Sequence, residues 1–210
     1  MSVVVAIKEK GRVFIGADSQ VTRGETRSTL KNPNNYKIWK VKGVDNCLMA
    51  HVGTFRDSNV IRVMDDLVTE YDVFKEMIDY EYVVKCIVPK LIDELRRYGY
   101  IEGSDYFKGF DSRFIFAYKE MLFVIGSEGS VLEIDDCAAI GSGECEAIGS
   151  LLSTDDETPE TRIVKAIKAS AASDIYVDYP IILTNTMDTE FEVITERNEK
   201  DFMDKNKGKK

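Results

Sequence analysis

Ser2 follows Met1 directly, and a serine at this position combines two groups that can do chemistry. Removal of the initiator methionine, which a small second residue permits, would leave Ser2 with a hydroxyl nucleophile and a free α-amine. The α-amine is a weak base with a reference pKa of about 7.7–8.0, so part of it is neutral near pH 7. An N-terminal serine can therefore activate its own hydroxyl without a histidine. The alternative is that Ser2 is an ordinary second residue.

The single histidine, His51, limits the other kinds of site that the chain can build. Any site that needs two histidine ligands is excluded, and a Ser-His-Asp triad would depend on His51 alone. His51 lies in residues 48–52, which read as a strand, and a lone strand histidine is more often structural than catalytic. The four cysteines form no CxxC pair, which predicts free thiols in a reducing cytosol.

The composition excludes several functional classes. The 210 residues carry a net charge of −9 and are 44% hydrophobic and 31% charged. An acidic chain lacks the basic face that nucleic-acid binding needs. No run of about 18 apolar residues predicts a membrane span, and no export signal is evident, so we expect a cytoplasmic protein. We expect one domain over residues 1–196 and a polar, frayed tail over residues 197–210.

The elements that position these residues follow from hydrophobic periodicity. Strands are predicted over residues 3–8, 12–18, 36–41, 46–52, 112–118, 121–126, 131–134, 137–140, 180–186 and 190–195. Helices are predicted over residues 54–71, 80–98, 143–153 and 158–173, with caps at Thr54 and Thr158 and a kink at Pro89. Residues 19–35 are predicted to form a loop. Segregated runs of strands and helices indicate an α+β fold, with two sheets packed face to face and a helix pair outside each.

Five motifs in chain order resemble the proteasome β-subunit family, and especially its bacterial relative, a simple peptidase that works with a hexameric unfoldase. They span residues 2 to about 194, nearly the whole predicted domain. The motifs are Ser2–Lys8 with Gly11 and Asp18, then Lys37 within residues 36–41, Gly53 within residues 52–57, Gly141-Ser142-Gly143, and Asp174 within residues 173–175. Each is weak alone, but their order over the expected helices and strands is specific. The resemblance implies an N-terminal nucleophile hydrolase fold, a four-layer αββα sandwich of antiparallel sheets.

The resemblance also implies a mechanism in which Ser2 attacks a peptide carbonyl. The α-amine of Ser2 would accept the hydroxyl proton and return it to the leaving amine. Lys37 would lower the hydroxyl pKa by its charge, and Asp18 would keep Lys37 ionised and oriented. The backbone N–H of Gly53 would stabilise the oxyanion. Without the resemblance, Lys37 reads as a solvent-facing strand residue, Asp18 as a turn residue and Gly53 as a strand-to-helix turn.

The remaining site residues are implied in the same way. Ser142 and Asp174 would hold the α-amine, although Ser142 alone reads as a helix cap. Thr22 would supply backbone hydrogen bonds to an extended substrate. Phe55 would border the first specificity pocket and His51 would lie near its base. An aromatic stretch is interpreted either as a ledge for a neighbouring subunit or as core or loop packing, and it comprises Tyr98, Tyr100, Tyr106 and Phe107.

The chain departs from the family pattern at two positions. The usual nucleophile is threonine, whereas this chain has Ser2, and Val177 stands where a hydroxyl residue usually follows the Asp by three. With no propeptide beyond Met1, exposure of Ser2 would depend on methionine removal. These departures leave two alternatives open, a catalytically silent ring subunit of the same fold and a small-molecule amidase or acylase.

The implied partners are a homo-oligomeric ring that encloses the sites and an unfolded polypeptide substrate. An ATP-dependent unfoldase remains open, whereas nucleic acid and membrane are not expected. The chemistry requires no cofactor. Whether a structural cation binds near the loop after Asp174 is open, and no metal ligands are identified.

Overall fold

The two sheets at the centre of the fold are antiparallel throughout. The computed structural model describes residues 2–74, 78–98 and 109–207. The strands of the first sheet, in spatial order, are β10 (Cys137–Gly141), β1 (Val3–Glu9), β2 (Arg12–Ala17), β11 (Ile181–Asn185) and β12 (Glu192–Ile194). Those of the second sheet are β5 (Ile38–Lys40), β6 (Cys47–Gly53), β7 (Ser112–Tyr118), β8 (Met121–Ile125) and β9 (Val131–Glu133).

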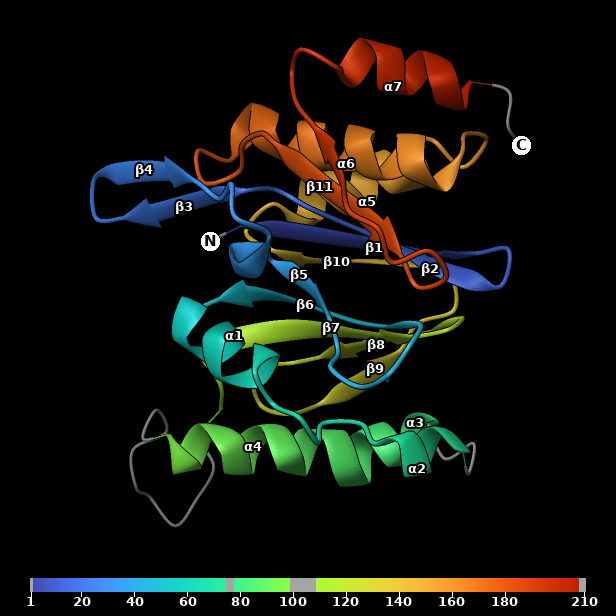
Figure 1. The fold of residues 1–210 in the computed structure, drawn as a ribbon. Coiled ribbons are helices and arrows are strands. Elements are labelled where there is room, and N and C mark those ends of the chain that lie inside the picture. The colour runs from blue at the N-terminus through green and yellow to red at the C-terminus, as the bar shows by residue number, and fades with distance from the viewer. Residues whose placement is uncertain (1, 75–77, 99–108, 208–210) are drawn as a thin grey trace.

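Helices cover the outer face of each sheet (Figure 1). The first sheet is covered by α5 (Glu144–Leu152) and α6 (Pro159–Ser173). On the other side lie α1 (Phe55–Arg62), α2 (Glu70–Phe74), α3 (Tyr80–Tyr82) and α4 (Val88–Arg97). The layers therefore run helix, sheet, sheet, helix, which confirms the predicted α+β sandwich.

Strand β1 is buried on both faces, which explains its continuous apolar sequence. Val3 and Val5 pack in the core between the first sheet and its helices. Val4 and Ala6 pack in the core between the two sheets. Because side chains alternate along an extended chain, Ser2 follows the same side as Val4, toward the second sheet. The strand that begins at Val3 thus brings Ser2 to one end of the space between the sheets.

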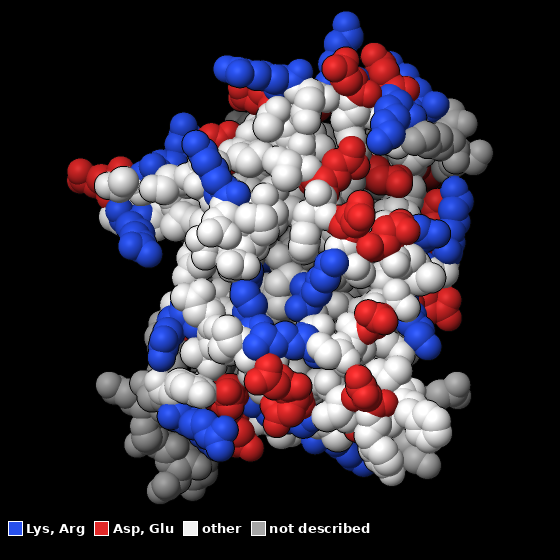
Figure 2. Space-filling model, viewed as in Figure 1, with Lys and Arg blue, Asp and Glu red and all other residues white. Residues whose placement is uncertain are grey.

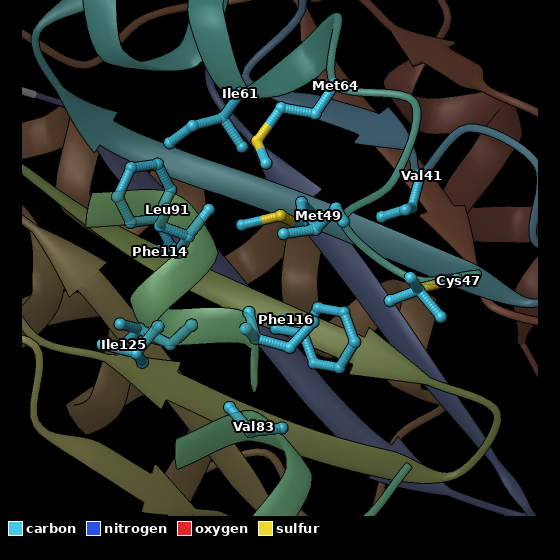
Figure 3. Packing of buried hydrophobic residues seen from close by; sticks show 14 of the residues in the cluster. Val41, Cys47, Met49, Ile61, Met64, Val83, Leu91, Phe114, Phe116 and Ile125 are labelled. Atoms are coloured by element: carbon cyan, nitrogen blue, oxygen red, sulfur yellow. The ribbon is translucent and has the colours of Figure 1, made fainter. Parts of the chain in front are cut away.

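The outer face of the second sheet is fixed by large apolar side chains. Figure 3 shows Met49 of β6 and Phe114 and Phe116 of β7 meeting Ile61 of α1 and Leu91 of α4. Each of these five side chains is at most 2% exposed. Burial of a side chain of this size contributes about 1.5–3 kcal/mol, so this layer holds β6 and β7 firmly in register. Their adjoining ends carry residues of the candidate site.

Residues 19–35, predicted to form a loop, contain a hairpin of β3 (Gln20–Arg23) and β4 (Thr26–Thr29), followed by the 3₁₀ turn η1 (Pro33–Asn35). The hairpin projects from the body of the molecule (Figure 1). Gly24 turns the chain with φ +55°. β4 is exposed along its whole length, so the hairpin has no alternating apolar pattern for the sequence to reveal.

The first two predicted helices are interrupted. In place of one helix over residues 54–71, α1 ends at Arg62 and α2 begins at Glu70. Thr54 is the N-cap residue of α1, as predicted, but its side chain makes no capping hydrogen bond. Over residues 80–98, a π-helical turn, η2 (Val83–Ile87), joins α3 to α4. Pro89 lacks an N–H and its ring crowds the carbonyl four residues earlier, which the wider π turn accommodates.

The C-terminal residues predicted as a frayed tail include a helix, α7 (Glu199–Asn206). It lies over α6 (Figure 1), and Phe202 is 5% exposed in the core of that layer. Phe202 and the adjacent Met203, which packs against the same core, thus dock a segment whose composition is otherwise polar. This explains why composition alone predicted a tail.

The distribution of surface charge and the state of the cysteines are as the composition predicts. Figure 2 shows acidic and basic side chains interspersed on the visible face rather than gathered into one basic field. All four cysteines are free, as predicted. Among the described residues, no helix is both long enough and apolar enough to span a membrane.

Candidate active site

A buried ion pair between Asp18 and Lys37 lies at the start of β1. The Lys37 Nζ donates to Asp18 Oδ1 at 2.7 Å, and the two side chains are 2% and 0% exposed. Asp18 also accepts hydrogen bonds from the N–H of Val3 at 3.0 Å and of Gln20 at 2.9 Å. The carboxylate therefore ties the lysine to the residue that follows Ser2. The solvent-facing interpretation of Lys37 is wrong.

Burial lowers the pKa of Lys37, and the carboxylates of Asp18 and Asp174 act in the opposite direction. Two carboxylates thus stabilise the charge of an ammonium that has lost its hydration. Removal of either interaction would favour the neutral amine. The Asp18–Lys37 pair therefore places two opposite charges where bulk solvent does not reach.

The Ser142 hydroxyl contacts the backbone nitrogen of Ser2. Ser2 N donates to Ser142 Oγ at 3.1 Å, and Ser142 Oγ lies 3.3 Å from the Ser2 carbonyl oxygen. The flanking glycines permit this approach. Gly141 has φ +119°, and a Cβ there would lie 2.0 Å from the Ser2 carbonyl oxygen. At Gly143 a Cβ would lie 2.6 Å from Ser170 Cβ, so a larger side chain at either glycine would displace the turn.

Ser142 is not the predicted helix cap. The N-cap residue of α5 is Gly143, with no side-chain cap. The turn is held from the α6 side, where Ser170 Oγ donates to the Gly143 carbonyl at 2.7 Å. The Ser142 hydroxyl therefore faces the start of β1, where the nitrogen of Ser2 lies.

Gly53 ends β6 in a conformation that glycine favours, with φ +121°. A Cβ at Gly53 would lie 2.2 Å from the Asp111 carbonyl oxygen. The next residue, Thr54, donates its N–H to Ser112 Oγ at 3.0 Å, and Ser112 pairs with Gly53 across β6 and β7. A side-chain hydroxyl thus anchors the turn, a contact that sequence patterns did not reveal. This turn and the Ser142 turn line one hollow of about 450 Å³.

Asp174 follows the last residue of α6. Its Oδ1 accepts the N–H of Tyr176 at 2.9 Å, and its buried Oδ2 has no hydrogen-bond partner among the described residues. Val177 is 3% exposed and packs in the apolar core of this layer. The position where the family pattern has a hydroxyl is therefore apolar.

Thr22 lies in the projecting hairpin, where its backbone pairs with that of Arg27. Gln20 connects this strand to the Asp174 loop, because its Nε2 donates to Thr22 Oγ1 at 3.1 Å and to the Ile175 carbonyl at 2.7 Å. In the described part of the chain, β3 has β4 as its one strand partner. The other edge of β3 can accept an added strand.

His51 lies beneath Phe55 and beside Trp39. Its ring is edge-on to both, with centroid separations of 5.5 Å to Phe55 and 5.7 Å to Trp39. His51 is 2% exposed. Burial lowers its pKa to about 3, and the charges of Lys37 and Arg62 act in the same direction. His51 is thus a neutral packing residue under Phe55, in accord with the structural interpretation of a lone strand histidine.

We predict that His51 makes the protein less stable in acid. The pKa of a histidine in the unfolded chain is about 6.5, above the folded value, so the unfolded state binds the extra proton. The stability contributed by neutral His51 is therefore complete above about pH 6.5 and falls by about 1.4 kcal/mol per pH unit below it. Urea unfolding of wild type and His51→Phe between pH 7 and pH 4.5 checks this. Parallel stability curves for the two proteins would contradict it.

Arg62 is a site residue that sequence reasoning missed. Its guanidinium donates to the carbonyls of Asn34 and Tyr36 and lies over the Trp39 ring, 4.8 Å from the centroid. These contacts hold in place the segment that precedes Lys37 in the chain. In the sequence, Arg62 is an arginine in the last turn of a helix, which carries no such signal.

The aromatic stretch and the metal ligands are the remaining features considered from the sequence. Tyr98 is 53% exposed just after α4, whereas Tyr100, Tyr106 and Phe107 of the aromatic stretch lie outside the described residues. Within residues 2–74, 78–98 and 109–207, no group of three or more His, Cys, Asp or Glu side chains could hold a metal ion.

Comparisons with known proteins identify the family and support the fold. The family model for the proteasome subunit matches residues 2–177. BPH from Thiobacillus denitrificans, solved in complex with epoxomicin, is 18% identical with a TM-score of 0.66, covering 92% of this chain and 99% of that chain. HslV from Trypanosoma brucei is 19% identical with a TM-score of 0.63, covering 87% and 98%. The Anbu (Gly-1) mutant from Hyphomicrobium sp. strain MC1 is 16% identical with a TM-score of 0.65, covering 95% and 90%. No curated sequence matches.

Proposed function

Because the chain belongs to the proteasome subunit family, we propose that it is a peptidase whose nucleophile is Ser2 after removal of Met1. The observation that carries the proposal is the environment of the Ser2 nitrogen. That nitrogen lies 3.1 Å from Ser142 Oγ, and the Asp18–Lys37 pair binds the N–H of the next residue. Once Met1 is removed, this peptide nitrogen becomes an α-amine, so that a hydroxyl, a basic nitrogen and a buried cation meet at one end of the space between the sheets.

In the proposed reaction, the Ser2 Oγ attacks the substrate carbonyl and its α-amine accepts the proton, directly or through a water. Lys37 favours the developing alkoxide by its charge, and Asp18 holds it in place. The amide of Gly53 donates to the oxyanion of the tetrahedral intermediate. The α-amine, oriented by Ser142, returns its proton to the leaving amine. Water then hydrolyses the ester on Ser2 and regenerates the enzyme.

The substrate is proposed to be an unfolded polypeptide that lies extended along the open edge of β3. Backbone groups of Thr22 would pair with it, and Phe55 with His51 beneath would form the wall of the first pocket, with an apolar or mixed preference. A homo-oligomeric ring in the cytoplasm, enclosing the active sites, would protect other proteins from cleavage. An ATP-dependent unfoldase would supply the unfolded chain. The chemistry itself uses no cofactor.

Purified assemblies incubated with unfolded casein test the proposed function. Mass spectrometry of the products is expected to show new peptides within the casein sequence, and folded proteins are expected to remain intact. Absence of cleavage by chains that begin at Ser2 would contradict the peptidase proposal. A second candidate function is a silent ring subunit of the same fold, which is favoured by the buried apolar side chain of Val177 at a position where the family pattern has a hydroxyl.

We predict that Gly53→Ala lowers kcat about 100–1,000-fold, the usual effect of losing one oxyanion donor. The added Cβ would overlap the Asp111 carbonyl, so the turn and its amide must move. Gly43→Ala is the matched control, since Gly43 also has positive φ, its Cβ would meet nothing within 4 Å, and it lies outside the β3–β4 hairpin proposed to bind substrate. Hydrolysis of a fluorogenic peptide with leucine at the cleaved carbonyl measures both. Equal activity of the two variants would remove Gly53 from the mechanism.

A further inference from the structure

Arg113 connects the two halves of the candidate site. It follows Ser112 at the start of β7, where it pairs with Val52, and therefore belongs to the second sheet. Its guanidinium reaches the turn after β10, in the first sheet. There Nη2 forms an ion pair with Glu144 and lies 3.4 Å from the Gly141 carbonyl oxygen. Because 3.4 Å is long for a hydrogen bond, the ion pair is the main anchor.

The two contacts of Arg113 flank Ser142 on both sides. Gly141 precedes Ser142 and Glu144 follows it by two residues, so the guanidinium spans the turn that carries the hydroxyl. Glycine-rich turns lose much conformational freedom on folding and therefore need external contacts to stay in one conformation. Ser170 supplies one such contact from α6. Arg113 supplies another from the opposite sheet.

We infer that Arg113 is a positioning residue for the reaction, holding Ser142 against the nitrogen of Ser2 through its ion pair with Glu144. The inference rests on the proposed function. It is supported by the hollow of about 450 Å³, which Arg113 lines together with Gly53 and Ser142. The Arg113 and Glu144 side chains are each 36% exposed, and ion pairs that solvent reaches contribute little to stability. We therefore expect the ion pair to act on the position of Ser142 and not on the stability of the fold.

Arg113→Met tests the inference in the full-length protein. Expected results are a roughly tenfold lower kcat for the fluorogenic leucine peptide, a KM within about twofold of wild type, and an unchanged Tm. Arg113→Lys keeps the charge and is expected to recover part of the kcat. The double variant with Glu144→Gln is expected to match Arg113→Met, because the two residues act as a unit. Arg12→Met is the control, since Arg12 is 35% exposed and pairs with Asp188.

A structure of Arg113→Met separates this inference from the proposed function. The separation of Ser2 N and Ser142 Oγ is expected to increase from 3.1 Å beyond hydrogen-bonding distance. That displacement in a protein whose wild type cleaves no peptide would support the positioning contact while refuting the peptidase. An unchanged separation with wild-type kcat would overturn the inference. A fall in Tm matching the loss of kcat would also overturn it, because the role would then be structural.

Discussion

Ser2→Ala is expected to abolish peptide hydrolysis, with kcat/KM falling by at least about 10³-fold. Alanine is also small enough for removal of Met1, so the variant keeps a free α-amine and loses only the hydroxyl. Ser2 is 6% exposed, and alanine fits its space without new contacts. We therefore expect the same fold and assembly as wild type, checked by circular dichroism and size-exclusion chromatography. The measurement is the rate of cleavage of the fluorogenic peptide.

Ser2→Thr is the matched control for this prediction. Threonine supplies the same hydroxyl and its methyl group restricts χ1, so activity is expected to persist. Cleavage by Ser2→Ala at the wild-type rate would show that the Ser2 hydroxyl is not the nucleophile. Loss of activity in both variants with intact folding would indicate that the site tolerates no change in shape at this residue.

Lys37→Met is expected to lower both stability and activity. It removes the cation from Asp18, a carboxylate that is 0% exposed. Breaking a buried ion pair on one side typically costs about 3–5 kcal/mol, because the remaining charge is buried without compensation. The hydroxyl of Ser2 would also lose the nearby charge that favours its ionisation. Urea unfolding and peptide cleavage measure the two effects.

The double variant Asp18→Asn/Lys37→Met separates the two roles of the pair. With both charges removed, the buried-charge penalty disappears and stability is expected to return toward that of wild type. Peptide cleavage is expected to remain lost, since no cation replaces Lys37. Recovery of cleavage together with stability would mean that Lys37 acts only on the fold.

The sequence predicted the sandwich because β1 and β2 carry strong apolar patterns and the helices α5 and α6 have clear periodicity. The sequence-based prediction was wrong in segments that bury few apolar side chains, because such segments carry no periodic apolar pattern. The exposed hairpin around Gly24 has no apolar alternation, and α7 is docked by only two adjacent apolar residues, Phe202 and Met203. The break after Arg62 was also invisible, because the apolar residues beyond it continue the helical spacing.

The candidate site was predictable where residue type and order carried the signal. Ser2, Asp18, Lys37 and Ser142 matched a family pattern, and the structure brings them together. The supporting contacts were not predictable, because they depend on the register of strands distant in sequence. Ser112 reaches the Gly53 turn only through the pairing of β6 with β7.

The central claim, that Ser2 is a nucleophile with a free α-amine, is tested most directly by intact mass and N-terminal sequencing of the assembly purified from cells, with and without epoxomicin. This epoxyketone offers electrophilic carbons to a hydroxyl and to an amine. We predict a chain that begins at Ser2, gains one inhibitor per subunit, and gains none in Ser2→Ala. A chain that retains Met1 and forms no adduct would contradict the account.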